Sequence, residues 1–174
     1  QQIDSKSIFI VHSFGLNWFL KKQIKCGALI NFFGVPNFLK LQNNPITTEK
    51  KVRQMIENFS TEPSVVLKNF YRKCNVFYNQ KKEINIDQCI KSLKELKNED
   101  LTDRFNSLNC KVFSIFSTHD NILNLNKNYI NSIKNKNHDI SFVEDLEHGF
   151  PTNNPELCYK MIKELLTKLN YESL

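Results

Sequence analysis

Three residues in this sequence could together carry out nucleophilic catalysis: Ser13, Asp120 and His148. Attack by a serine hydroxyl needs a neighbouring general base, and the base needs a third group that fixes its tautomer and stabilises the imidazolium. A serine, a histidine and a carboxylate supply these three parts. Each of the three residues follows an apolar segment with the length of a buried strand, so they could meet at one edge of a sheet.

The elements that would position these residues are short strands alternating with helices. Four runs rich in β-branched and aromatic residues predict strands, and they cover residues 7–11, 28–33, 111–117 and 139–143. Apolar residues at helical spacing predict helices, and these cover residues 16–24, 123–133 and 154–169. Strand, helix, strand units of this kind build parallel sheets with right-handed crossovers.

The segment from 47 to 97 interrupts this alternation. It is polar and lysine-rich, and its apolar residues lie three and four positions apart, which predicts three or four short helices. Pro63 and the stretch 75–85 divide them. We therefore interpret residues 1–46 and 98–174 as an α/β core and residues 47–97 as a helical insertion.

Composition excludes several classes of protein. The chain has 174 residues, of which 40% are hydrophobic, as expected for one globular domain. Its net charge of +6 comes from lysines spread among asparagines, whereas nucleic-acid-binding faces cluster arginine with aromatic residues, so we expect no nucleic-acid partner. No apolar run approaches the roughly 20 residues of a membrane span. We expect no membrane span.

The cysteines and the first residues indicate the cellular setting. Five cysteines, an odd number without a CxxC pair, indicate neither a disulfide framework nor a zinc site, and they favour a reducing cytoplasm. The chain begins at Gln1 without a starting Met or a signal-peptide pattern. We expect it to be the interior of a longer gene product.

The chain order of serine, acid and histidine, each after a strand, resembles that of the α/β-hydrolase superfamily. The motifs that carry the resemblance are VHSFG at 11–15, FSTHDNIL at 116–123 and EHGFPTNNPE at 147–156. The resemblance implies a three-layer α/β-hydrolase-like fold with a parallel sheet that lacks the early strands. It also implies that the insertion at 47–97 is a lid.

Within this superfamily the chain looks most like the pimeloyl-[acyl-carrier protein] methyl ester esterases of biotin synthesis. The matching features are Gln1 and Gln2, the helical insertion, the SLKEL segment at 92–96 and Asp100 with Leu101. The resemblance implies a cytoplasmic serine carboxylesterase that demethylates carrier-bound pimeloyl methyl ester through an acyl-enzyme. It implies no cofactor or metal, and a monomer when the protein is full length.

The resemblance also implies a role for each site residue. Ser13 is the expected nucleophile, His148 the base and Asp120 the orienting acid. The backbone amide of Phe14 is one expected oxyanion donor, and the second donor is expected from a loop N-terminal to Gln1. Two departures from the family pattern, Val11 before the turn and Leu16 after it, could shift the turn.

Aromatic and basic side chains are candidates for substrate contacts. Phe32, Phe33 and Phe150 are expected to line an acyl pocket because they lie near the strand ends, and Phe70 is either pocket or core. Trp18 is expected in the core. Three basic side chains on one predicted helix either meet the acidic surface of an acyl-carrier protein or form a solvated face; they are Lys68, Arg72 and Lys73.

Other readings of the same residues stay open. Ser13 could instead cap a helix. His119 is expected at the surface, His12 beside the site or in packing, and His138 in a solvated loop. Asp145 and Glu147 are weaker candidates for the acid than Asp120, because neither follows a strand with a turn towards the pocket.

The function also has alternatives. The same three residues could cleave another ester or a thioester, because the sequence indicates the machinery better than the pocket. A truncated hydrolase without activity, or one completed by another chain, is the second alternative.

Overall fold

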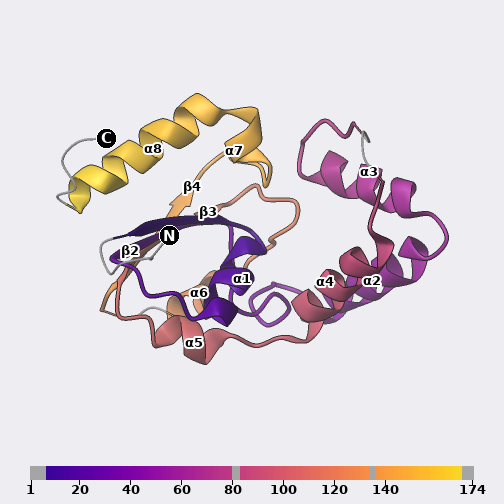
Figure 1. The fold of residues 1–174 in the computed structure, drawn as a ribbon, viewed down its shortest axis with the longest axis horizontal. Coiled ribbons are helices and arrows are strands. Elements are labelled where there is room, and N and C mark those ends of the chain that lie inside the picture. Colours follow the sequence, from indigo (N-terminus) through magenta and orange to yellow (C-terminus); the bar gives the residue numbers. More distant parts are fainter. Residues whose placement is uncertain (1–6, 80–82, 134–135, 170–174) are drawn as a thin grey trace.

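A computed structural model of the chain describes residues 7–79, 83–133 and 136–169. Its centre is a parallel sheet with helices on both faces (Figure 1). Within the described residues the sheet has four strands, which lie in chain order: β1 (Ile8–His12), β2 (Ala28–Phe32), β3 (Lys111–Ser117) and β4 (His138–Val143). The predicted three-layer parallel sheet is confirmed, and its strands lie within one residue of the expected bounds.

The two central strands are apolar because helices cover them on both faces. All five residues of β2 are buried, and β3 is buried from Val112 to Ser117. The strands pair in register, with Ile10 opposite Ile30 and Ile30 opposite Phe113. Within the described residues β1 pairs with β2 alone, so β1 is an edge strand.

Helices on the two sides of the sheet complete the layers. Figure 1 shows α1 (Gly15–Lys22), α5 (Thr102–Asn106) and α6 (Lys127–Ser132) on one side, and α8 (Pro155–Lys168) on the other. A short helix, α7 (Phe150–Asn153), precedes α8.

The helix α1 packs on the sheet through one face only. Leu16, Phe19 and Leu20 are buried, whereas Trp18 lies on the outer face and is 54% exposed. The expectation that Trp18 belongs to the core is therefore wrong. A helix of eight residues with three consecutive apolar positions cannot turn all of them inward.

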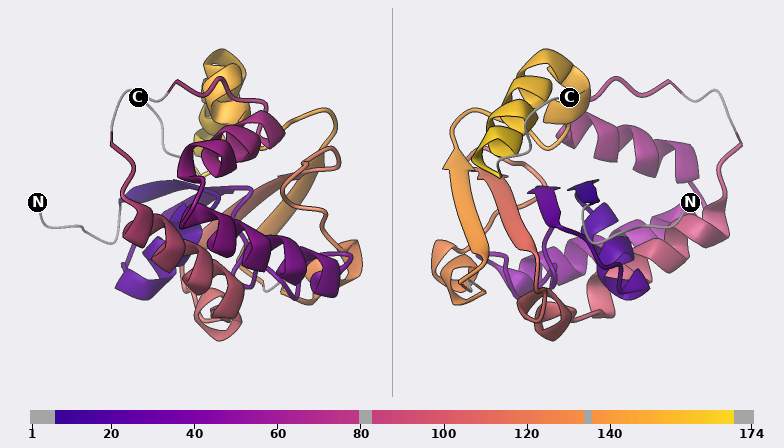
Figure 2. Two further views of the ribbon diagram at one scale, coloured as in Figure 1. Left: turned by 90° about the vertical axis from the view of Figure 1, so that its right-hand side faces the viewer. Right: turned by 60° about the vertical axis from the view of Figure 1, so that its left-hand side comes forward.

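Three helices occupy the stretch between β2 and β3 that interrupts the alternation. They are α2 (Pro45–Phe59), α3 (Pro63–Lys73) and α4 (Ile86–Asn98), and they lie beside the sheet rather than on its faces (Figure 2). Asn44 and Asn85 begin α2 and α4, because their side chains accept hydrogen bonds from the amides of Thr47 and Gln88. Proline in the first turn also favours the start of α2 and α3.

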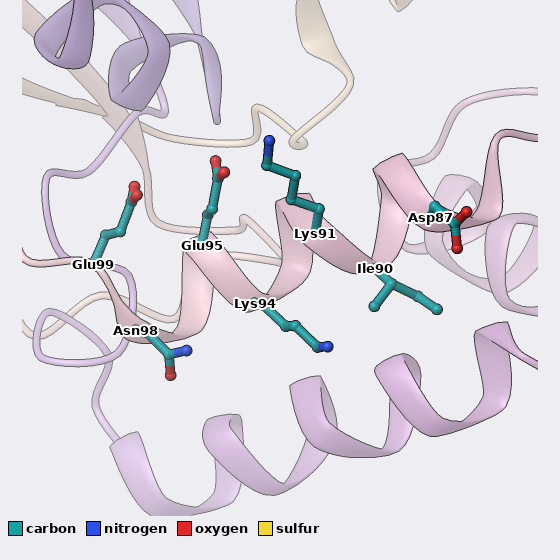
Figure 3. A pocket seen from close by; sticks show the side chains of 7 residues that line it. All are labelled: Asp87, Ile90, Lys91, Lys94, Glu95, Asn98 and Glu99. Carbon is teal, nitrogen blue, oxygen red and sulfur yellow. The ribbon is translucent and has the colours of Figure 1, made fainter.

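An ion-pair cluster fastens α4 to α1. The Nζ of Lys21 lies 2.9 Å from Glu95 and 2.8 Å from Glu99, and the two glutamates point to the same side of α4 (Figure 3). Glu95 and Glu99 line a surface hollow of about 460 Å³ along α4, and both of their carboxylates form ion pairs with Lys21. The residues that line this hollow include no serine, cysteine or histidine.

Two further expectations are wrong. The helix expected over 123–133 is reduced to α6. The residues before α6 form a loop, because their backbone amides donate hydrogen bonds to the side chains of Asp120 and Gln42. His138 is not solvated: it begins β4 and is 5% exposed.

No helix in the described part of the chain is long and apolar enough to cross a membrane. Gln1 and Gln2 lie outside the described residues.

Candidate active site

Ser13 occupies the tight turn between β1 and α1. Its amide donates to the carbonyl of Phe32 at 2.9 Å, and its carbonyl accepts from the amide of Leu16 at 3.1 Å, where α1 begins. The φ angle of Ser13 is 53°, in the left-handed region that costs a residue with a side chain about 1–3 kcal/mol. This backbone strain marks a tight turn between strand and helix at Ser13.

The three residues singled out by their chemistry form one hydrogen-bonded relay. The Oγ of Ser13 lies 2.8 Å from Nε2 of His148, and Nδ1 of His148 lies 2.7 Å from Oδ2 of Asp120. Because the carboxylate only accepts, Nδ1 carries a proton and donates it, which leaves Nε2 to accept the hydroxyl proton of Ser13. His148 and Asp120 are 2% and 7% exposed, so the relay is shielded from water except at Ser13.

Hydrogen bonds to backbone groups hold Asp120 and His148 in place. The Oδ1 of Asp120 accepts from the amides of Ile122 and Leu123 at 2.7 and 2.9 Å. The Nε2 of His12 donates to the carbonyl of His148 at 2.8 Å, so His12 lies beside the relay as expected. Desolvation lowers the pKa of His12 below its usual 6.5 and outweighs the hydrogen bond to the His148 carbonyl, which raises it. The charges of His148 and Asp120 act on this pKa in opposite directions.

The amide of Phe14 is available to a ligand. It donates to no group among the described residues, and it belongs to the residue directly after Ser13. An amide in this position can stabilise negative charge that develops on a substrate oxygen.

A small apolar cavity of about 180 Å³ opens at Ser13. Phe33 and Phe70 line it together with Ser13 and Phe14, so the structure brings these two expected contact residues to the site. Phe33 has a φ of 57°. Phe32 and Phe150 do not line the cavity: they are 1% and 3% exposed, and their rings pack at 6.1 Å in the core.

A larger cavity of about 470 Å³ adjoins the small one below α2, α3 and α4. The two cavities share five apolar lining residues, which are Phe38, Phe70, Leu93, Leu96 and Ile122. The lining of the larger cavity is otherwise mostly polar, and it includes Lys73. Lys68, Arg72 and Lys73 are all exposed on α3.

A second serine–histidine pair lies inside the sheet and has a different character. Asn31 donates to the Oγ of Ser114 at 3.1 Å, Ser114 lies 2.8 Å from Nε2 of His138, and Nδ1 of His138 lies 3.2 Å from the carbonyl of Ile133. Ser114 is 1% exposed and lines neither cavity at the strand ends. This chain satisfies buried polar groups, and no substrate can reach Ser114.

The other candidate acids and bases do not join the site. His119 pairs with Asp145 at 3.2 Å, and both side chains are exposed. Glu147 accepts a hydrogen bond from Asn75 instead. Within residues 7–79, 83–133 and 136–169, no three His, Cys, Asp or Glu residues come together as a metal-binding group.

The site also involves residues that the sequence pattern did not single out. Gln42 is 2% exposed, and its Oε1 accepts from the amide of Asn124 at 3.0 Å, four residues after the acid. Asn31 holds the turn after β2 by bonds to both the amide and the carbonyl of Gly34. Gln42 belongs to no recognisable motif, because it acts on a segment 82 residues away in the sequence.

Solved structures share this architecture. They include an esterase from Exiguobacterium antarcticum (TM-score 0.72, 15% identity, covering 91% of this chain and 65% of that chain). They also include an α/β-hydrolase enzyme from a Medee basin deep-sea metagenome library (TM-score 0.69, 13% identity, covering 98% and 67%). A third is a bromoperoxidase from Bacillus anthracis (TM-score 0.66, 10% identity, covering 92% and 67%).

Sequence comparison finds no match: no protein-family model fits the chain, and no curated protein matches it. The chain spans about 65% of the length of the Exiguobacterium esterase. Esterases and a bromoperoxidase share the architecture, so the fold alone does not define the reaction. What the structural likeness shows is that this chain has the α/β-hydrolase fold.

Proposed function

We propose that the chain is a serine carboxylic ester hydrolase with Ser13 as nucleophile, His148 as general base and Asp120 as orienting acid. The observation that carries the proposal is the buried relay of two hydrogen bonds, 2.7 and 2.8 Å long, that ends at Ser13 beside an apolar cavity. Esterases among the structures with this fold support the same reaction class.

The geometry supports a two-step mechanism. In the first step, the Oγ of Ser13 attacks the ester carbonyl while its proton passes to Nε2 of His148, and Asp120 stabilises the resulting imidazolium. The amide of Phe14 donates to the carbonyl oxygen as it gains negative charge. His148 then returns the proton to the leaving alcohol, which leaves an acyl-enzyme on Ser13. A water molecule activated by His148 releases the acid in the second step.

We propose a carrier-bound pimeloyl methyl ester as the substrate, with α2, α3 and α4 as a lid over it. The apolar cavity at Ser13 and its continuation under these helices suit an acyl chain that begins at the ester and extends beneath them. Lys68, Arg72 and Lys73 lie exposed on α3, where an acidic carrier surface could dock. Another ester or a thioester is the alternative substrate.

The second oxyanion donor belongs to this proposal. One donor is typically responsible for about two to three orders of magnitude in rate, so a site with Phe14 alone is expected to turn over slowly. We propose that the second donor comes from a segment outside the described residues. A chain that reacts at Ser13 but turns over slowly agrees with this proposal.

The test compares this chain with Ser13→Ala and Ser114→Ala. The probes are a fluorophosphonate that reacts with activated serine, short p-nitrophenyl esters and methyl pimeloyl carrier protein. We expect Ser13→Ala to lose labelling and at least about three orders of magnitude in kcat/KM. Ser114→Ala should keep both, because that hydroxyl lies inside the sheet.

The outcomes separate the alternatives. Preference for the carrier substrate over free esters supports the biotin-synthesis assignment, and its absence favours another ester. If the chain neither reacts with the fluorophosphonate nor hydrolyses any ester, the hydrolase proposal fails, and an inactive hydrolase fragment takes its place.

A further inference from the structure

Two thiols face each other at the end of the sheet opposite Ser13. Cys26 lies two residues before β2, and Cys110 lies directly before β3. The Sγ of Cys26 donates a hydrogen bond to the Sγ of Cys110 at 3.5 Å. Since β2 and β3 are neighbouring parallel strands, this contact joins the beginnings of the two strands. Ser13, Asp120 and His148 follow the strand ends, about 20 Å away for strands of this length.

The thiol pair can be reached from solvent. Both cysteines are partly exposed, and both line a surface cavity of about 620 Å³. Lys25 and Arg104 line the same cavity, and its lining contains no Asp or Glu. Basic side chains without acidic neighbours favour the thiolate over the thiol.

The two thiols differ in acidity. The hydrogen bond from Cys26 lowers the pKa of the Cys110 thiol below its usual 9.0, and the same contact raises the pKa of Cys26. Peroxides react with the thiolate, so Cys110 is the more reactive partner. Cys26 lies in position to react next.

We propose that Cys26 and Cys110 form an oxidation site at which a peroxide converts the two thiols to a disulfide between β2 and β3. The Cys110 thiolate attacks one peroxide oxygen, the O–O bond breaks, and Cys110 becomes a sulfenic acid while hydroxide leaves. The sulfur of Cys26 then attacks the sulfenic sulfur and displaces its hydroxyl group. Two thiols and one hydrogen peroxide thus yield one disulfide and two water molecules, with two electrons passing to the peroxide.

The other cysteines do not compete for this reaction. Cys74 and Cys158 are buried, and burial raises the pKa of Cys74 to about 12. Cys89 on α4 is partly exposed, but it has no sulfur partner among the described residues. The pair is also no metal centre within the described residues, because no third metal-ligating side chain joins it.

The test treats the fully reduced chain with hydrogen peroxide, blocks the remaining thiols under denaturing conditions and maps the peptides by mass spectrometry. We expect a peptide containing Cys26 to be joined to one containing Cys110, with the loss of two of the five titratable thiols. Dithiothreitol should restore all of them. The ester assay is not needed for this result, so the oxidation site stands or falls apart from the proposed function.

Variants assign the two roles. Cys26→Ser should stop at a sulfenic acid on Cys110, which dimedone traps, whereas Cys110→Ser should remove the cross-link and leave Cys26 unmodified at the same peroxide dose. Cys89→Ser is the matched control and should keep the cross-link. Circular dichroism checks the fold of each variant, and Cys26→Ala replaces Cys26→Ser if serine perturbs it. Five thiols still titratable after peroxide treatment, or a disulfide that persists in Cys26→Ser, overturns the proposal.

Discussion

Asp120 uses its two carboxylate oxygens for different purposes. Oδ2 accepts from His148, and Oδ1 accepts from the amides of Ile122 and Leu123. The backbone bonds fix the carboxylate, and the carboxylate fixes the tautomer of His148 that can accept the proton of Ser13. The proposed reactivity of Ser13 therefore depends on a loop that lines the small cavity at Ser13 through Ile122 and Leu123.

The first prediction concerns this carboxylate. Asp120→Asn replaces an acceptor with an amide that can donate, so His148 is expected to adopt the wrong tautomer and kcat to fall about 10⁴-fold. KM should change little, because Asp120 does not line the substrate cavity. Steady-state ester kinetics measure both values. Asp145→Asn is the control, since that side chain is 85% exposed, and equal losses in both variants would contradict the assignment.

The second prediction concerns the protonation of His12. Its pKa is lowered from 6.5 in the folded chain, so between 6.5 and the lower folded value the unfolded chain binds a proton that the folded chain does not. Stability is therefore lost as the pH falls through this interval. We expect His12→Gln, which keeps a donor for the His148 carbonyl, to lose less stability than the parent between pH 7.5 and pH 5.5. Urea unfolding at the two pH values checks this, and parallel losses would refute it.

At the scale of elements, the site depends on how closely the turn after β2 approaches the turn after β1. A Cβ on Gly34 would lie 2.7 Å from the Cβ of Leu16 and 2.9 Å from the carbonyl oxygen of Ser13, and it would also collide with Asn31. Gly15 has room, since a Cβ there would meet only Val11, at 3.8 Å. Val11 therefore does not crowd the turn from this side.

The third prediction compares these two glycines. Gly34→Ala must displace the backbone of Ser13 or break the Asn31 bonds, so we expect a loss of about 1–3 kcal/mol in unfolding free energy and at least about tenfold in kcat. Gly15→Ala should change either quantity little. Chemical denaturation and ester kinetics on both variants make the comparison. An active, stable Gly34→Ala would show that the turn is more yielding than its contacts indicate.

Local pattern was enough to predict the strands and the three chemical residues, because buried strands are continuous apolar runs and the triad residues follow them. The local sequence pattern did not predict the hydrogen bonds that position the loop before α6 and bury His138. The loop before α6 is held by Asp120 and Gln42 instead of continuing as helix, and His138 is buried because Ser114 and Ile133 supply its partners. Ser114 lies 24 residues from His138, and Gln42 lies 82 residues from Asn124, so no spacing along the sequence identifies these pairs.

At the scale of the whole molecule, the β1 edge is the least protected part of the sheet. Within the described residues the outer side of β1 has no partner strand, and Ile10 on it is 51% exposed. Trp18, on the outer face of the adjoining α1, is exposed to a similar degree. An open strand edge with apolar side chains is a template for pairing with another strand.

The fourth prediction is that this chain on its own associates through the β1 edge. Burying the exposed half of the Ile10 side chain contributes on the order of 1 kcal/mol to each contact between chains. A lysine at this position loses that contribution and places a charge where burial is unfavourable. We therefore expect Ile10→Lys to weaken association about tenfold. Ile46→Lys is the control, because Ile46 is 71% exposed but lies on α2, away from the edge. Sedimentation velocity over a range of concentrations measures the effect. A chain that stays monomeric throughout, or two variants that shift association equally, would show that another surface, or none, governs assembly.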